Sequence, residues 1–205
     1  MAVIVIEGVV ATGKTALLKA IEESAMWQER PTKAVISEHY TERVLELTSP
    51  TLADRQNLLA EHLNLAQALH RRWAGARFRG NPAVEPLVVL ERFHLTHAAQ
   101  IGDFAPFREF DAQLRELGGK LILLHHPPER LLPDILATMP SRPPLWESWL
   151  RSLGSEKDIE SYFAALQRRS LDYYEQSCLA KESYLAYSLS PRQLAQKIRD
   201  LCDLS

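Results

Sequence analysis

The sequence predicts a three-layer α/β fold in which helices cover both faces of a parallel sheet. Five short runs are apolar at nearly every position and rich in β-branched residues, a pattern typical of strands that are buried on both faces. Helical patterns separate these runs, as in repeated βαβ units joined by right-handed crossovers. Both observations favour a five-stranded parallel sheet flanked by helices.

The apolar runs predict strands at residues 2–7, 33–38, 87–91, 120–125 and 183–187. Helical periodicity predicts helices at residues 14–26, 52–75, 93–101, 105–117, 128–137, 158–180 and 191–202. Proline at the start of two of these helices, and Gly118 with Gly119 after a third, are plausible start and stop signals. Residues 139–154 are rich in proline and break the alternation, so we expect an inserted loop there with at most a short helix.

The bulk properties favour one soluble domain. A chain of 205 residues with 46% hydrophobic composition is long enough for one substantial core and too short for two ordinary domains. The formal net charge of −2 provides no general field to attract nucleic acid or an anionic membrane. The apolar start lacks a basic leader, and no run reaches the ~18 apolar residues of a membrane span. Cys178 and Cys202 lack metal-ligand spacing, which fits a reducing cytoplasm.

A glycine-rich motif follows the first predicted strand and opens the first predicted helix. Its residues are Gly8, Val9, Val10, Ala11, Thr12, Gly13, Lys14 and Thr15, which fit the P-loop pattern G-x-x-x-x-G-K-[ST]. Glycines let the backbone turn its amides toward phosphates, and the helix N-terminus adds partial positive charge. We expect Lys14 to reach the β- and γ-phosphates of a nucleoside triphosphate and Thr15 to ligate Mg²⁺. The alternative is a tight turn that contains these residues by chance.

Charged residues end two other predicted strands. Glu38 ends the second strand, and Glu91 followed by Arg92 ends the third. In parallel α/β sheets the ligand crevice lies beyond the carboxyl ends of the strands, so these side chains are expected to face the crevice that the P-loop borders. A carboxylate can act as a base toward an acceptor hydroxyl or support Mg²⁺, and an arginine can stabilise charge on a transferred phosphoryl group. The alternative for Glu38 is a solvated strand end.

With these residues in place, the sequence resembles the P-loop nucleoside and nucleotide kinases, especially deoxynucleoside kinases and thymidylate kinases. The resemblance covers most of the chain. It rests first on Ile-Glu-Gly at residues 6–8 with Gly-Lys-Thr at 13–15. Leu-Glu-Arg at 90–92 is similar to the family's E-R-S. The strand at 121–124 with Pro-Pro-Glu at 127–129, and the helix at 158–163, also resemble family segments.

The resemblance implies an ATP- and Mg²⁺-dependent kinase for a small-molecule acceptor such as a nucleoside. Carried over by position, Glu38 would be the catalytic base, Glu91 would support Mg²⁺ and Arg92 would contact the acceptor. Residues 139–156 would form a lid whose closure excludes water. Either Arg142 or Arg151 would close over the triphosphate.

Several family residues are missing, which leaves the acceptor open. No proline follows Glu38, the R-E-P-G-G segment of thymidylate kinases is absent, and residues 93–97 lack a serine and a second acidic residue. On the helix at 52–75, Gln67 is a candidate to grip a base edge and Arg71 a candidate acceptor ligand. The leading hypothesis is phosphorylation of a hydroxyl of a nucleoside or similar molecule. The alternatives are a nucleoside monophosphate kinase, and a nucleotide-binding regulatory protein with a degenerate acceptor site.

Two further clusters have simpler structural interpretations. His94 and His97 lie three residues apart on a predicted helix, but no third metal ligand is evident. A basic cluster with interleaved aromatic residues spans 71–79, and a solvated helix end explains it better than a nucleic-acid contact. The long helix at 52–75 could form the homodimer surface seen in similar kinases.

Overall fold

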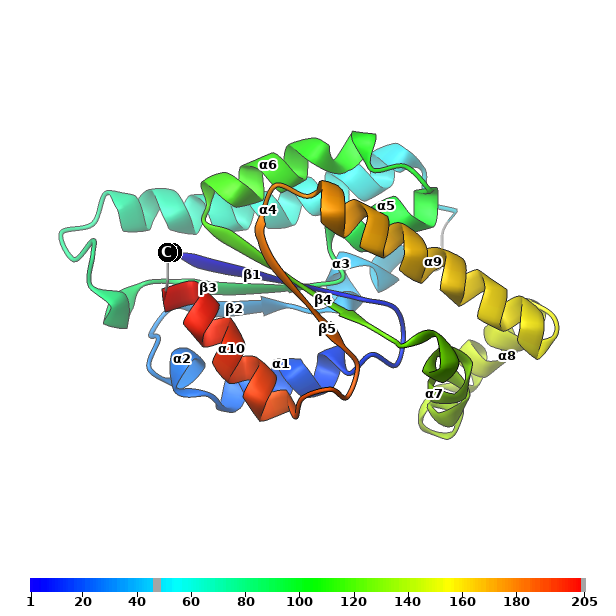
Figure 1. Cartoon of the computed structure of the whole chain (residues 1–205). Helices are drawn as coiled ribbons and strands as arrows, with labels where there is room; N and C mark the ends of the chain where they lie inside the picture. Colours follow the sequence, from blue (N-terminus) through cyan, green and yellow to red (C-terminus); the bar gives the residue numbers. More distant parts are fainter. Residues whose placement is uncertain (46–48, 204–205) are drawn as a thin grey trace.

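The computed structural model, which describes residues 1–45 and 49–203, contains a five-stranded parallel sheet (Figure 1). Its strands are β1 (Ala2–Glu7), β2 (Lys33–Ile36), β3 (Leu87–Glu91), β4 (Gly119–His125) and β5 (Ala180–Leu185). They lie in the order β2-β3-β1-β4-β5, and every neighbouring pair is parallel. The predicted fold class, a parallel five-stranded α/β sheet flanked by helices, is confirmed. It is consistent with a P-loop NTPase-like fold.

Ten α-helices accompany the sheet in the described part of the chain. They are α1 (Lys14–Glu23), α2 (Ala25–Gln28), α3 (Glu38–Thr41), α4 (Leu52–Ala74), α5 (His94–Ile101), α6 (Arg108–Glu116), α7 (Leu131–Ala137), α8 (Pro144–Ser152), α9 (Glu156–Gln176) and α10 (Pro191–Asp203). Short 3-10 helices are η1 (Arg43–Leu45), η2 (Pro82–Val84), η3 (Ala105–Phe107), η4 (Pro128–Arg130) and η5 (Met139–Ser141). No helix of residues 1–45 and 49–203 combines the length and the apolar character needed to cross a membrane.

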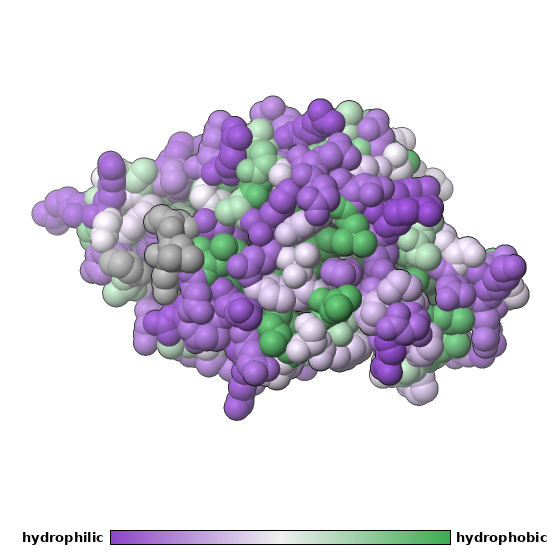
Figure 2. All heavy atoms as spheres, in the orientation of Figure 1, coloured by the Kyte–Doolittle hydropathy of each residue, from purple (hydrophilic) through white to green (hydrophobic). Residues whose placement is uncertain are grey.

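Alternate residues of the central strands enter two separate cores, which makes the fold three-layered. Val3 and Val5 of β1 face a core formed with α4, α5, α6 and α9. Ile4 and Ile6 face the opposite core, formed with α1, α2 and α10. Figure 1 shows these two groups of helices on opposite faces of the sheet. The face seen in Figure 2 is mostly hydrophilic, and its apolar residues form small patches.

The predicted bounds of both edge strands are wrong, and the last strand ends at Leu185 instead of at residue 187. The predicted second strand extends to residue 38, but β2 ends at Ile36, and Glu38 begins α3 instead of ending a strand. Ser37 keeps an extended backbone and the amide of Glu38 donates to Glu91 Oε2 at 3.3 Å, which starts the helix there. The last strand begins at Ala180, three residues before the predicted start, because it pairs only with β4 and alternates in exposure.

Four of the predicted helices need correction. The first stops at Ser24, whose extended backbone (ψ 156°) and hydroxyl, which donates to Ile21 O at 2.6 Å, separate α1 from α2. The predicted helix at 158–180 is α9, which begins at Glu156 after a capping box between Ser155 and Asp158 and ends at Gln176. The predicted helix at 105–117 is divided between η3 and α6, and the predicted helix at 128–137 is divided between η4 and α7.

The proline-rich segment is folded into helices rather than a loop. Within the predicted lid, residues 139–156, the structure contains η5 and the nine-residue α8, which starts at Pro144 where a missing amide hydrogen costs nothing. Leu150 of α8 is fully buried in a third apolar cluster that includes Val9 and Val10 of the P-loop. The helix before this segment, α7, and the helix after it, α9, contribute residues to the same cluster. The segment and the P-loop therefore share one core.

Candidate functional site

The P-loop adopts a backbone conformation that requires glycine. Gly8 follows β1 with a φ of 140°, and a Cβ atom there would lie 2.2 Å from the carbonyl oxygen of Leu124. Gly13 has a φ of 92° and precedes the first residue of α1. Ala11 occupies the left-handed region with a φ of 64°, which costs about 1 kcal/mol in a residue with a side chain. The segment is therefore a strained strand-to-helix turn, as the phosphate-binding motif requires.

Lys14 is folded against the P-loop itself. Its side chain is buried and its Nζ atom donates to Val9 O at 2.8 Å, an oxygen that also accepts from Thr12 Oγ1 at 2.9 Å. Burial, with a further contribution from the charge of Arg92, lowers the pKa of Lys14 to about 7, although nearby carboxylates oppose the shift. Thr15 lies exposed in the first turn of α1. Both side chains predicted to contact a triphosphate and its metal thus start at this turn.

The structure brings Glu38 and Arg92 together. Arg92 Nε lies 2.8 Å from Glu38 Oε2, and Arg92 Nη1 donates to Glu42 Oε2 at 2.8 Å. Arg43 Nη2 contacts the other Glu38 oxygen at 2.6 Å. Burial by itself would raise the pKa of Glu38, but the charges of Arg92 and Arg43 outweigh it and hold the pKa below its usual value. Glu38 is therefore ionised at neutral pH. Lys14 responds to the charges of Arg92 and Glu38, so this cluster lies beside the P-loop.

Arg92 is held in place from both sides. Burial would lower its pKa, but the charges of Glu42 and Glu38 raise the pKa above its usual value, so the guanidinium stays charged. Its backbone has a φ of 51°, and its amide donates to Ile6 O at 2.9 Å. The same carboxylates keep the guanidinium beside the end of β1. A residue other than glycine in the left-handed region is strained, and such strain is often found at functional sites.

Glu91 ends β3 with one carboxylate oxygen engaged and the other without a partner. Oε2 accepts from the amide of Glu38, whereas Oε1 is buried and accepts no hydrogen bond from the described residues. A buried carboxylate oxygen without a donor is costly unless a ligand supplies one. With the hydroxyl of Thr15, it provides the oxygen chemistry that Mg²⁺ prefers. Among the described residues, no cluster of three or more His, Cys, Asp or Glu could hold a metal without further ligands.

A small cavity of about 40 Å³ lies between the P-loop and the helices α5 and α9. Its walls include residues 8–10, Arg92, Thr96 and Gln100, together with Phe163 of α9. Glu7 holds this wall in place, because its buried carboxylate accepts from the amides of Phe93 and Leu95 at the start of α5. The cavity therefore combines an arginine, a hydroxyl and an amide with an apolar side.

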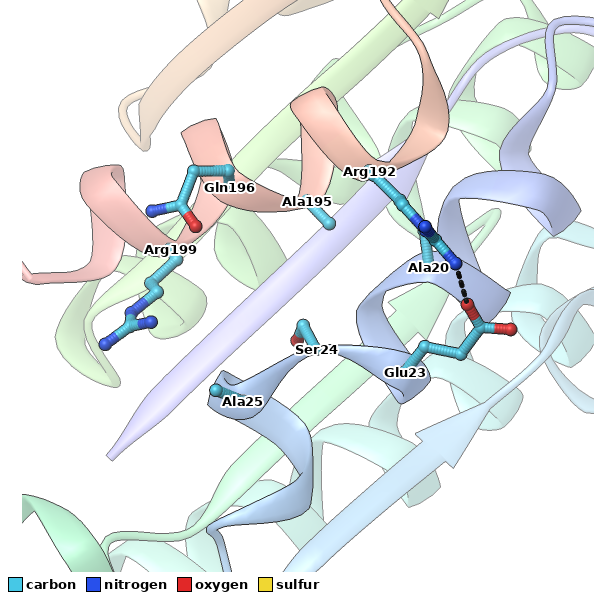
Figure 3. Close-up of a pocket in the computed structure, with 8 residues that line it drawn as sticks. All are labelled: Ala20, Glu23, Ser24, Ala25, Arg192, Ala195, Gln196 and Arg199. Carbon is cyan, nitrogen blue, oxygen red and sulfur yellow. Dashed lines mark ion pairs between the residues drawn. The ribbon is translucent and has the colours of Figure 1, made fainter.

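A second, wider cavity lies away from the P-loop. A cavity of about 270 Å³ lies between the ends of α1 and α2 and the face of α10 (Figure 3). Arg192 and Glu23 form a loose, exposed ion pair across it at 3.8 Å. Glu23 is the last residue of α1, whereas the P-loop leads into the first turn of α1. This cavity and the P-loop therefore lie at opposite ends of that helix.

The two predicted lid arginines occupy different positions. Burial lowers the pKa of Arg142, and the charge of Glu38 opposes that shift, so Arg142 lies within electrostatic reach of the Glu38 cluster. Its guanidinium also stacks over Trp146, 5.4 Å from the ring centre. Arg151 is exposed and pairs with Glu147 one turn earlier at 2.7 Å. The structure brings Arg142 to the site and leaves Arg151 on the outer surface of α8.

Two of the residues predicted to bind the acceptor, Gln67 and Arg71, do not reach this edge of the sheet, whereas the third, Glu38, does. Gln67 donates to Gln113 near the end of α6, which leads into the amino end of β4, and the exposed Arg71 lies a turn further away. The first turns of α4, which contain Arg55, lie beside the crevice instead. Arg55 Nη1 donates to Gln100 and to Nδ1 of His97 at 3.0 Å.

His97 is a structural member of this network. Its Nε2 atom donates to Thr41 O at 2.6 Å while Nδ1 accepts from Arg55. Burial lowers the pKa of His97 to about 4, so the ring is neutral. His94 Nε2 lies 3.0 Å from Asp111 Oδ1, so the two histidines have different partners.

Sequence reasoning missed Glu42, Arg43 and Arg55. Glu42 follows Glu38 by four residues, so an expectation of helix instead of strand at Glu38 would have placed the two on one face, whereas the spacing of Arg43 gives no such signal. Arg55 shows no motif, and only the packing of α4 against α5 brings it to the crevice.

Comparison with known proteins adds evidence on the fold. No family model matches the sequence, and no curated protein matches it at a significant level. Among solved structures, the chain is similar to the YorR protein of Bacillus subtilis, whose crystal structure is a complex with phosphorylated GDP. The two chains share 17% identity, the match covers 98% of this chain and 96% of that chain, and the TM-score is 0.54. At this identity, the likeness supports the fold alone.

Proposed function

We propose that the chain is an ATP- and Mg²⁺-dependent phosphotransferase that phosphorylates a hydroxyl of a nucleoside or similar small molecule. The observation that carries the proposal is the ion pair of Glu38 and Arg92 beside the P-loop lysine, at the carboxyl edge of a parallel sheet. A triphosphate site alone explains Lys14. A carboxylate held ionised in the same crevice is suited to accept a proton from an acceptor hydroxyl.

Each part of the site has a role in this proposal. The P-loop amides and Lys14 bind the β- and γ-phosphates, and Arg142 approaches them from the lid. Thr15 and the unpartnered oxygen of Glu91 fit a hydrated Mg²⁺ ion, which supplies charge neutralisation on the phosphates. Glu38 orients the acceptor hydroxyl and takes its proton, while Arg92 stabilises the charge that develops on the transferred group.

One observation favours a second acceptor class. Arg43, Arg92 and Arg142 surround Glu38, and Arg55 lies in the same network through Gln100. Several guanidinium groups suit a phosphate on the acceptor, so a nucleoside monophosphate is the alternative substrate.

Acceptor-dependent release of ADP tests the proposal. Purified protein with ATP and Mg²⁺ is assayed with nucleosides, nucleoside monophosphates and unrelated hydroxyl compounds. The leading proposal expects stimulation by at least one nucleoside or related hydroxyl compound. Stimulation by monophosphates alone would select the second candidate. If ATP binds and no acceptor stimulates release, a nucleotide-binding regulatory protein replaces both.

A further inference from the structure

Two consecutive peptide carbonyls of the P-loop are tied to side chains from distant parts of the chain. His126, just after β4, donates from Nε2 to Val10 O at 2.9 Å. Tyr187, just after β5, donates from its hydroxyl to Ala11 O at 2.9 Å. With the contacts to Val9 O described above, three successive carbonyls are engaged on the protein side of the loop.

These ties determine where the loop amides point. In a trans peptide the C=O and the following N–H point in opposite directions. When Val10 O is held toward His126, the amide of Ala11 is turned the other way. That amide donates no hydrogen bond to any residue in the described ranges, although it belongs to a loop whose neighbouring side chains are buried. It is left for a ligand, and the left-handed backbone of Ala11 needs such restraints to persist.

The ring of His126 is fixed by a second contact. It is almost fully buried, and its Nδ1 atom lies 3.2 Å from Asp134 Oδ2, while Arg130 donates to Asp134 Oδ1 at 2.6 Å. A carbonyl oxygen can only accept, so Nε2 carries the proton that is donated to Val10 O. The contact of Nδ1 with Asp134 fixes the orientation of the ring.

The backbone of His126 is held as tightly as its ring. Its amide donates to Gln167 Oε1 at 2.8 Å, and its carbonyl accepts from Gln167 Nε2 at 3.0 Å. Gln167 belongs to α9 and Asp134 to α7, the helices on either side of the segment 139–156. His126 therefore contacts the P-loop and both stems of that segment.

We propose that His126 is a positioning residue that presents the Ala11 amide to the phosphates of a bound triphosphate and joins the P-loop to α7 and α9. The inference rests on the proposed triphosphate site, but it requires no acceptor. It assigns to a histidine outside the motif a share of the loop geometry that the motif alone does not provide.

A matched pair of variants tests the contact with Val10. In His126→Gln the terminal nitrogen can occupy the place of ring Nε2 and keep the donor to Val10 O. In His126→Asn the shorter amide reaches only the place of Nδ1, beside Asp134. Dissociation constants are measured by calorimetry for Mg-ATP and for inorganic tripolyphosphate, which binds without a base, and unfolding temperatures are recorded for each protein.

The expected result separates the two variants. His126→Asn weakens both probes roughly tenfold, as the loss of a buried hydrogen bond predicts, and His126→Gln recovers most of that loss at a similar unfolding temperature. Equal affinity in all three proteins, or equal losses in both variants, would overturn the inference and leave the proposed function intact. If the wild-type chain bound neither probe, the proposed function would fail as well.

A second measurement needs no variant. Amide hydrogen exchange of the wild-type chain is compared with and without Mg-ATP. The proposal expects slower exchange in the P-loop and also in α7 and in the middle of α9. Nucleotide binding should stabilise the contacts of His126 with Asp134 and Gln167, which belong to these two helices. Slower exchange confined to residues 8–15 would overturn the link to the lid stems.

Discussion

The guanidinium of Arg92 lies 2.8 Å from the carboxylate of Glu38, and the two residues come from segments that are more than fifty positions apart in the chain. The pair joins the ends of β2 and β3 directly beside Lys14. It also keeps Glu38 ionised while burial works against the charge. This relationship turns a triphosphate-binding loop into a candidate site for phosphoryl transfer.

Replacing Glu38 by Gln tests its assignment as the base. The variant keeps the side-chain volume and removes the proton acceptor, so turnover should fall by roughly 10²-fold or more while ATP affinity stays within about threefold. Glu147→Gln on the surface of the lid is the control and should leave turnover unchanged. Unaltered turnover in the Glu38 variant would remove this residue as the base.

The lowered pKa of Lys14 predicts proton uptake when nucleotide binds. With a pKa of about 7 in the ligand-free site, the amine is mostly neutral at pH 8, and the phosphates favour its charged form. Binding at pH 8 should therefore take up a proton, and less should be taken up near pH 6, where the amine is already charged. Calorimetry in buffers of different ionisation enthalpy measures this. Lys14→Arg, which stays charged, should show no such uptake at pH 8; equal uptake in both proteins would contradict the assignment.

Gly8 should tolerate alanine much less than another glycine of similar backbone conformation. The added Cβ at Gly8 would lie 2.2 Å from Leu124 O, whereas at Gly80, with a φ of 88°, it would meet open space. Gly8→Ala should cost at least about 3 kcal/mol of unfolding free energy, against about 1–2 kcal/mol for Gly80→Ala. Denaturant unfolding measures both values, and equal losses would mean that the close approach to β4 is absent.

The two arginines of the lid should differ in function. Arg142→Ala removes a charge that reaches the Glu38 cluster, so turnover should fall by roughly tenfold or more. Arg151→Ala removes only an exposed pair with Glu147, worth at most about 1 kcal/mol to stability, and should leave turnover within about twofold. Steady-state kinetics of the two variants decides between them, and a larger loss at Arg151 would reverse the assignment.

The sequence predicted the structure best where local residue type determines the backbone conformation. The buried strands β1 and β3 have the predicted bounds because both of their faces are apolar, and Gly8 and Gly13 mark a turn that only glycine readily adopts. Edge strands were less predictable, because exposure on one side weakens the apolar pattern.

The crevice was harder to predict, since its contacts depend on how helices pack. The prediction for Gln67 and Arg71 rests on the family's polar anchors on this helix, yet the direction of α4 brings Arg55 to the crevice and takes the other two to the opposite edge. Arg142 and Arg151 share one segment, but Arg142 lies in the extended turn before α8 and Arg151 lies in the last turn of α8. The spacing of Glu147 and Arg151, four residues apart, is a signal for an exposed pair that could have been used.

Transfer of the γ-phosphoryl group from ATP is the measurement that tests the account most directly. Wild-type protein and Lys14→Ala are incubated with ATP labelled in the γ-phosphoryl group, Mg²⁺ and the nucleoside panel, and mass spectrometry locates the label. The proposed function predicts label on an acceptor hydroxyl with the wild-type protein and none with Lys14→Ala at an unchanged unfolding temperature. Label found only in inorganic phosphate, or full transfer by Lys14→Ala, would contradict it.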